Sequence, residues 1–223
     1  MSPSGALWDE LLDQARARLE WTWKHFGPQV AVCWTGGKDS TVVLHLWRSV
    51  LARRAPQVRP VALSIDTGWK FPQIVEFRSY LARQWDVENV VVAPAPCSVP
   101  VAEDPVACCH ARKVVPLQEA VTRMGLAAVL VGVRADEHPL RDRHWHWAAA
   151  GHQRVAPILE WTEAHVWTYH AWAEIPWCCL YDQGYRSLGC VPCTRPSQDG
   201  AERAGRDPRK EAAMGALQSL GYF

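Results

Sequence analysis

Apolar positions along the chain follow two different periods, which together predict alternating helices and strands. Residues 6–26 place Leu11, Leu12, Ala15 and Leu19 at helical spacing, as expected for an amphipathic helix. Short apolar runs predict buried strands at 30–34, 58–65, 89–93 and 127–133. Helical segments are expected between them at 40–52, 72–85 and 112–124. This alternation predicts an α/β fold, a Rossmann-like parallel sheet flanked by helices.

The pattern weakens beyond residue 140. A helix is expected at 161–172 with Thr162 as its cap, and another at 208–220. The run Arg-His-Trp-His-Trp at 143–147 has two open interpretations, an aromatic lid over a ligand or a packed loop. We expect one nucleotide-binding domain over residues 1–195, which includes the cysteine motifs, and a tail over residues 196–223.

Composition narrows the classes of function. The chain has 223 residues, 48% of them apolar, and a formal net charge of +1, so it offers no electrostatic case for a nucleic-acid or membrane surface. Nucleic acid is neither indicated nor excluded. No signal-like segment and no apolar run of membrane-spanning length is present, so a cytoplasmic location without a membrane is expected. A protein partner or a homodimer stays open.

The strongest chemical signal follows the first predicted strand. Two glycines let the backbone turn and present its N–H groups to an anion, while the next helix directs its positive end to the same place. Lysine adds charge and serine adds a hydroxyl donor. The predicted nucleotide-binding residues are Thr35, Gly36, Gly37, Lys38, Asp39 and Ser40. A plain Gly-Gly turn is the alternative.

A second polar loop, Asp66-Thr67-Gly68, follows the next predicted strand. Ligands of open α/β sheets bind beyond the carboxyl ends of the strands, so this loop is also expected beside the nucleotide. The alternative is a turn that only terminates the strand.

Eight cysteines are many for a cytosolic chain, where disulfides rarely persist. Cys108 and Cys109 are adjacent, and Cys190 and Cys193 form a Cys-x-x-Cys motif, which favours metal ligation. An iron–sulfur cluster, zinc and free thiols remain alternatives, although adjacent cysteines fit a bulky cluster more easily than zinc. Cys33 is expected in the core, and Cys97, Cys178 and Cys179 stay unassigned.

These motifs resemble two known families. The glycine loop resembles the PP-loop of the ATP pyrophosphatases, and residues 66–72, 76–78 and 221–223 resemble the small subunit of bacterial ATP sulfurylase. Both cysteine motifs resemble the adenylyl-sulfate reductase branch of the phosphoadenylyl-sulfate reductase family, together with Arg112-Lys113, residues 182–185 and residues 202–206. The resemblance implies an adenine nucleotide alpha-hydrolase-like fold. It also implies a 4Fe–4S cluster held by Cys108, Cys109, Cys190 and Cys193.

The segment after the fourth predicted strand is rich in arginine. Similar segments in the family carry arginines that contact the phosphate or sulfate of the substrate, which implies this role for Arg134 and Arg141, with Lys38 as the third catalytic residue. A solvated charged loop is the alternative.

The two resemblances point to different reactions. An intact PP-loop indicates ATP, whereas the reductases carry a nucleophilic cysteine in a Glu-Cys-Gly context and this sequence has no cysteine after Cys193. The prediction is an iron–sulfur enzyme of sulfur metabolism that cleaves ATP with Mg²⁺ between the α and β phosphates and adenylylates an acceptor, a sulfur oxyanion or a sulfur acceptor. One alternative is a reductase that releases sulfite from adenylyl sulfate with an internal or partner thiol. Another is a non-catalytic subunit that senses nucleotide and redox state.

Overall fold

Within residues 5–141, 144–197 and 200–222, which the computed structural model describes, six strands form one sheet in the order β3-β2-β1-β4-β6-β5. Every neighbouring pair is parallel except β5 and β6, which are antiparallel. The strands are β1 (Val30–Cys33), β2 (Val61–Ile65), β3 (Glu88–Val92), β4 (Ala128–Leu130), β5 (His146–Ala149) and β6 (His152–Val155).

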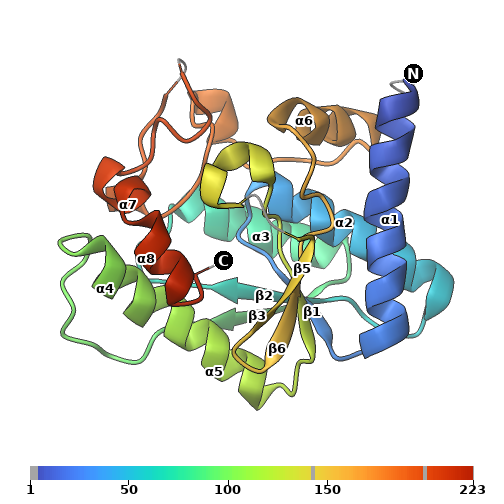
Figure 1. Cartoon of the computed structure of the whole chain (residues 1–223), viewed down its shortest axis with the longest axis horizontal. Coiled ribbons are helices and arrows are strands. Elements are labelled where there is room, and N and C mark those ends of the chain that lie inside the picture. The colour runs from blue at the N-terminus through green and yellow to red at the C-terminus, as the bar shows by residue number, and fades with distance from the viewer. Residues whose placement is uncertain (1–4, 142–143, 198–199, 223) are drawn as a thin grey trace.

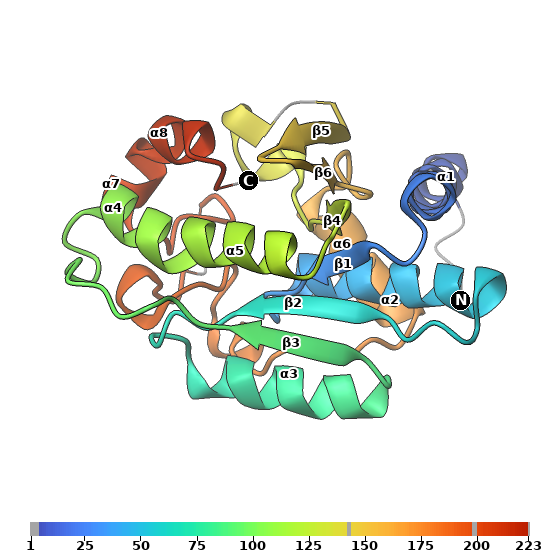
Figure 2. The same ribbon diagram turned by 90° about the horizontal axis from the view of Figure 1, so that it is seen from below.

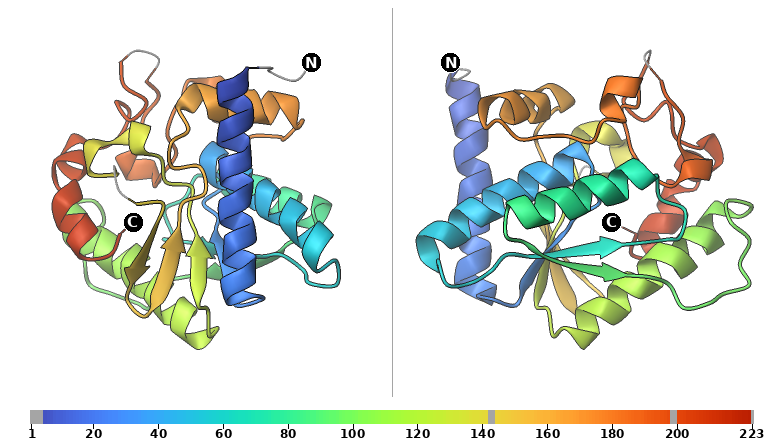
Figure 3. Two further views of the ribbon diagram at one scale, coloured as in Figure 1. Left: turned by 45° about the vertical axis from the view of Figure 1, so that its right-hand side comes forward. Right: turned by 180° about the vertical axis from the view of Figure 1, so that it is seen from behind.

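Helices cover both faces of this sheet (Figures 1 and 2). Side chains alternate along β1, so that Val30 and Val32 join the core under α1, α2, α3 and α6, while Ala31 joins the core under α5 and α8. Helix α1 stands at the opposite side of the molecule from α4, α7 and α8 (Figures 1 and 3). The helices are α1 (Ala6–Phe26), α2 (Lys38–Arg54), α3 (Pro72–Gln84), α4 (Pro105–Cys109), α5 (Val115–Arg123), α6 (Glu163–Trp172), α7 (Pro208–Ala212) and α8 (Met214–Ser219).

The predicted α/β class with a parallel sheet is confirmed, and Thr162 caps α6 by accepting a hydrogen bond from the His165 N–H at 3.3 Å. The helix expected at 112–124 begins earlier, because α4 continues through a π-helical turn (His110–Val114) into α5. The helix expected at 208–220 is divided at Ala213.

The aromatic run at 143–147 is partly a strand rather than a lid or a loop. His146 and Trp147 belong to β5, which pairs with β6, and Trp145 packs against the core. Arg143 lies outside the described residues. Neither β5 nor β6 was predicted from the sequence.

In the described part of the chain, no helix combines the length and the apolar character needed to cross a membrane.

Candidate active site

The glycine loop sits where β1 ends and α2 begins, and its own hydroxyl groups fix its shape. The Gly37 N–H donates to Thr35 Oγ1 at 3.1 Å, and the Thr35 N–H donates to Ser40 Oγ at 3.2 Å. Gly36 has a φ of +81°, and a Cβ there would lie 3.0 Å from Ile74 and 3.1 Å from the Arg78 side chain. The loop therefore requires glycine at position 36 for conformation and for space.

Gly132, just beyond β4, presses against the start of α2. A Cβ at this position would lie 2.7 Å from the Ser40 backbone nitrogen and 2.9 Å from the Asp39 carbonyl carbon. Because both neighbours are backbone atoms, neither can move away as a flexible side chain would. Gly132 thus sets how closely β4 approaches the glycine loop.

Lys38 is 1% exposed and is surrounded by oxygen acceptors. Its Nζ donates to Glu202 at 2.5 Å, to the Arg186 carbonyl at 3.2 Å and to Asp39 at 3.4 Å. Burial alone would lower the pKa of Lys38, but Asp39, Tyr181 and Glu202 outweigh it and raise that pKa. The loop lysine is therefore a charged group whose partners are carboxylates of this chain.

Arg134 completes the same network from behind the loop. It is fully buried, its Nε donates to Asp39 at 2.7 Å, and its Nη2 forms an ion pair with Glu202. Arg134 is not among the residues that line the cavity described below, whereas Arg141 is, paired with Glu137. Carboxylate oxygens of Asp39, Glu137 and Glu202 lie within 4.8 Å of one another.

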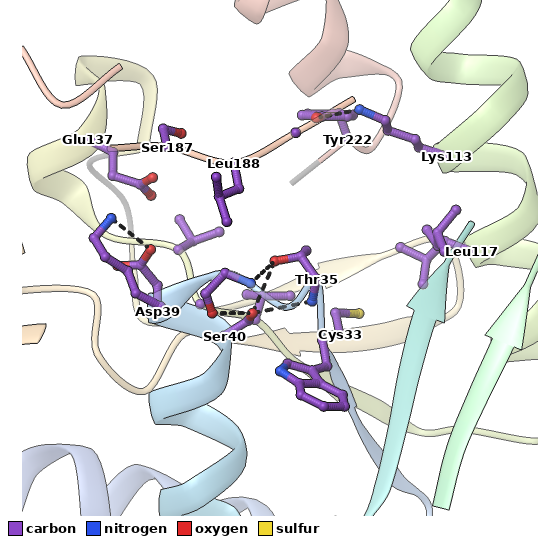
Figure 4. Close-up of a pocket in the computed structure, with 18 of the residues that line it drawn as sticks. Cys33, Thr35, Asp39, Ser40, Lys113, Leu117, Glu137, Ser187, Leu188 and Tyr222 are labelled. Carbon is purple, nitrogen blue, oxygen red and sulfur yellow. Dashed lines mark hydrogen bonds and ion pairs between the residues drawn. The ribbon is translucent and has the colours of Figure 1, made fainter. Parts of the chain in front are cut away.

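A cavity opens between this loop and the last residues of the described chain. Thr35 and Ser40 lie on one side of it, and Lys113 and Tyr222 lie across it (Figure 4). Cationic side chains gather at this far end: Lys70, Lys113, Arg154 and Arg206 all line the cavity. Its floor is apolar, formed by Cys33, Leu63, Ile65, Leu117 and Val131.

Electrostatic coupling links the far end to the cysteine motifs. Burial raises the pKa of Cys190, but Lys113 and Lys70 outweigh it and lower the pKa to about 7. Burial and Lys113 lower the pKa of Lys70 to about 8. Lys113 and Lys210 lower the pKa of Tyr222 to about 7 against the effect of its burial. Thiols, a phenol and lysines thus form one charged cluster.

The fold brings three of the four predicted ligand cysteines together. Cys109, Cys190 and Cys193 share the neighbour Lys113, and Cys190 Sγ lies 3.2 Å from Thr67 Oγ1. The Val191 N–H donates to the Trp69 carbonyl at 2.8 Å, which ties the Cys-x-x-Cys motif to the loop after β2. Cys108 precedes Cys109 in α4, immediately before the π-helical turn, a distortion that often marks functional sites.

The other predicted residues are placed as follows. Asp66 shapes its own loop by accepting from the Gly68 N–H at 2.9 Å, and residues 66–68 approach the cysteines rather than the lining of the cavity. Cys178 is buried in a small cluster with Ile74 and Leu180, and Cys97 and Cys179 are exposed. Cys33, expected in the core, is half-buried: it packs against the core under α5 and also lines the cavity.

Several site residues escaped sequence reasoning. Glu202 lies in the family-like segment 202–206 and Glu137 in the arginine-rich segment after the fourth predicted strand, but neither was predicted as a site residue. Nothing local shows that Glu202 pairs with Lys38 or that Glu137 pairs with Arg141 and Arg203. Lys113 and Tyr222 lie inside segments that resemble the two families, but the resemblance assigned neither residue a role. Arg78 lies inside such a segment as well; it is 2% exposed and packs under Gly36.

Comparisons of the sequence with known proteins point to one family. The family model described as phosphoadenosine phosphosulfate reductase domain matches residues 29–196. The chain is 33% identical to the adenosine 5'-phosphosulfate reductase of Rhodococcus erythropolis over 214 residues, covering 87% of this chain and 85% of the relative. It is 29% identical to the Bacillus pumilus enzyme of the same name over 215 residues, covering 89% and 88%.

Two solved structures show the same fold. The phosphoadenylyl-sulfate reductase of Candida auris in a phosphate complex superposes with a TM-score of 0.66 at 21% identity, covering 87% of this chain and 99% of that one. The FMN adenylyltransferase of Candida glabrata in complex with ATP gives a TM-score of 0.71 at 20% identity, covering 86% and 64%. At such identities the likeness concerns the fold alone.

Proposed function

Because the chain belongs to the phosphoadenosine phosphosulfate reductase domain family, we propose that it binds adenylyl sulfate and releases sulfite from it, with electrons from an external dithiol. The observation that carries this proposal is the distribution of charge along the cavity. Lysines and arginines that line the far end adjoin thiols and a phenol, whereas the cations of the glycine loop are paired with carboxylates.

This distribution favours a ligand whose charge lies away from the loop. A triphosphate would place its β and γ phosphates against Lys38, which already donates to Glu202 and Asp39. Adenylyl sulfate has no such phosphates, and its sulfonyl group would reach the end that holds Lys113 and Arg206. Arginine and lysine are the side chains that proteins use for oxyanions. The names of the sequence relatives favour the same ligand over ATP.

The reaction needs a thiolate at the sulfur atom. Attack by a thiolate breaks the bond between sulfur and the bridging oxygen, so that AMP leaves and a thiosulfonate forms. A second thiolate then forms a disulfide and expels sulfite, and the two thiols supply both electrons. Among the described residues that line the cavity Cys33 is the one cysteine, and burial raises its pKa to about 11, which makes it a poor nucleophile. We therefore propose that the dithiol comes from another molecule.

We further propose that Cys108, Cys109, Cys190 and Cys193 hold a 4Fe–4S cluster. The fit rests on charge: the buried Lys210 and the half-buried Lys113 lie beside Cys109 and Cys193, and a cation removed from water is costly without an anion nearby. Four thiolates around a cluster supply that negative charge. When bound, the cluster would contribute its charge to the electrostatics of the sulfonyl end.

ATP cleavage is the second candidate function. One observation favours it: the close carboxylates of Asp39, Glu137 and Glu202 offer oxygen ligands that suit Mg²⁺. For Mg²⁺ to bind there, Lys38 and Arg134 would have to leave these carboxylates and move onto the phosphates.

An anaerobic assay separates the two functions. The purified protein is incubated with adenylyl sulfate and dithiothreitol, and sulfite and AMP are measured. In parallel it receives ATP, Mg²⁺ and sulfate, and pyrophosphate is measured. Sulfite and AMP in equal amounts without pyrophosphate support the proposal. Pyrophosphate release without sulfite formation overturns it in favour of ATP cleavage, and tight nucleotide binding without either product indicates a sensing subunit.

The cluster is tested with Cys109→Ser and Cys179→Ser. Cys109 is a proposed ligand, while Cys179 is exposed and serves as the matched control. Anaerobically purified wild type and Cys179→Ser should be brown with about four iron atoms per chain. Cys109→Ser should lose most of the iron and the visible absorbance. Equal iron contents in all three proteins would contradict this assignment.

A further inference from the structure

The last described residues return to the cavity through a specific helix ending. Helix α8 is followed by Gly221 with a φ of +83°. The Gly221 N–H donates to the Gln218 carbonyl at 2.9 Å and the Tyr222 N–H donates to the Leu217 carbonyl at 3.0 Å. This is the hydrogen-bond pattern of a Schellman motif. The turn leads residues 221–222, here named the tail segment, into the cavity wall.

Two oxygen atoms of the tail segment accept hydrogen bonds from three cations. The Gly221 carbonyl accepts from Arg154 Nη2 at 2.7 Å. The Tyr222 hydroxyl accepts from Lys210 Nζ at 2.6 Å and from Lys113 Nζ at 3.5 Å. These cations come from β6, α7 and the π-helical turn, so that separate elements converge on the tail segment.

The same cations suit an incoming oxyanion. Lys113 and Arg154 line the cavity together with the tail segment, and Tyr222 lies beside Lys113 across from the glycine loop (Figure 4). A sulfonyl or phosphoryl group at this end needs several hydrogen-bond donors that point to one place. In this structure those donors point to the two oxygens of the tail segment.

We propose that the tail segment occupies the oxyanion subsite of the cavity, and that the anionic group of a nucleotide must displace it from Lys113, Lys210 and Arg154 in order to bind. The tail segment thereby selects for ligands that carry an oxyanion, since adenosine alone offers nothing to replace the two oxygens. The inference rests on the proposed function only for the identity of the ligand, an adenine nucleotide with a terminal oxyanion.

The oxyanion ligand binds only molecules whose subsite is open. Its apparent Kd is therefore the intrinsic Kd divided by the fraction of open molecules. Removal of the Tyr222 hydroxyl takes away the hydrogen bonds from Lys210 and Lys113 but leaves the one from Arg154 to the Gly221 carbonyl, so that fraction should increase about three- to tenfold. Removal of the Tyr222 hydroxyl should therefore tighten the binding of oxyanion ligands, whereas a residue that only contacts the ligand would weaken binding when truncated.

The first test compares Tyr222→Phe with Tyr80→Phe in the anaerobically purified full chain. Tyr80 is 51% exposed on α3 and serves as the matched control. Titration calorimetry gives the Kd of AMP and of adenosine. The expected result is a roughly three- to tenfold lower Kd of AMP for Tyr222→Phe, with adenosine and Tyr80→Phe unchanged. An unchanged or higher Kd of AMP for Tyr222→Phe overturns the inference.

A second measurement uses the wild-type chain and does not depend on a variant. Hydrogen exchange of the Gly221 and Tyr222 amides should become faster when AMP is added, because the tail segment leaves its place, and should not change with adenosine. Unchanged or slower exchange with AMP would overturn the inference. Failure of the proposed function is a separate outcome, absence of sulfite from adenylyl sulfate, and leaves the AMP measurements to decide on the tail segment.

Discussion

Glu202 holds the glycine loop to a distant part of the chain, and its neutralisation should destabilise the fold. Its carboxylate is 8% exposed and pairs with Lys38 and Arg134, whose side chains are 1% and 0% exposed. In Glu202→Gln the amide oxygen can still accept from one cation, but the amide NH₂ group faces the other. That buried cation then keeps Asp39 and one more exposed carboxylate as counter-ions, Glu163 for Lys38 or Asp136 for Arg134.

Removal of one partner of a buried ion pair costs about 3–5 kcal/mol, because the remaining charge stays desolvated. The glutamine oxygen recovers part of this loss, so we expect the free energy of unfolding to fall by about 3 kcal/mol. The matched control is Glu160→Gln. Glu160 pairs with Arg18 but is 45% exposed, and solvent-exposed pairs contribute about 0–1 kcal/mol.

Urea denaturation followed by tryptophan fluorescence measures both variants under anaerobic conditions. The double variant Lys38→Met/Glu202→Gln provides a second test, since removal of the lysine also removes the charge that Glu202→Gln leaves unpaired. Its free energy of unfolding should fall by clearly less than the sum of the decreases in the two single variants. Glu202 would not be the buried counter-ion described here if Glu202→Gln cost no more than Glu160→Gln, or if the two single losses were simply additive.

Three further predictions concern two other parts of the site and a histidine on α2 outside it. Gly132→Ala pushes a methyl group against the Ser40 backbone nitrogen, so it should cost about 1–3 kcal/mol in urea denaturation and weaken AMP binding, whereas Gly5→Ala, with open space around it, should do neither. Lys113→Met should raise the Kd of adenylyl sulfate about ten- to a hundredfold and leave adenosine binding unchanged, and equal losses for both ligands would argue against a role at the sulfonyl end. Burial, followed by the charge of Arg48, lowers the pKa of His45 to about 4, so the unfolded chain binds more protons than the folded chain between pH 4 and 6.5. The free energy of unfolding in urea should therefore fall as the pH drops through that window, and it should fall less steeply in His45→Phe.

The order of secondary structure was predictable because its signals are local. The apolar run at β1 and the Gly-Gly turn after it depend on residues within a few positions of one another, and so does the Thr162 cap of α6. Strands β5 and β6 were missed because their sequences, His-Trp-Ala-Ala and His-Gln-Arg-Val, lack the continuous apolar run that marks β1, a strand of the same length. They are held by pairing with each other, and β6 also pairs with β4.

The glycine loop of the site was predictable because its residues are neighbours in the sequence, whereas its distant partners were not. The loop residues lie together in the sequence, but the carboxylate that pairs with Lys38 is 164 residues away, and the phenol that accepts its backbone N–H, that of Tyr181, is 143 residues away. Likewise, Cys190 meets Thr67 across 123 positions. Only the path of the chain brings such groups together, so a single sequence without its fold cannot indicate them.

An overall charge of +1 conceals a separation of charge within the cavity. At the loop end, Glu202 neutralises the cations that a PP-loop would offer to pyrophosphate. At the far end, Lys113 has thiols and the Tyr222 hydroxyl as its neighbours, which are weaker or displaceable anions. An intact loop motif therefore does not by itself determine the nucleotide. In the proposed function the ligand's negative charge goes to the end where this chain's own anions are easiest to replace, and Glu202 makes the loop end the harder of the two.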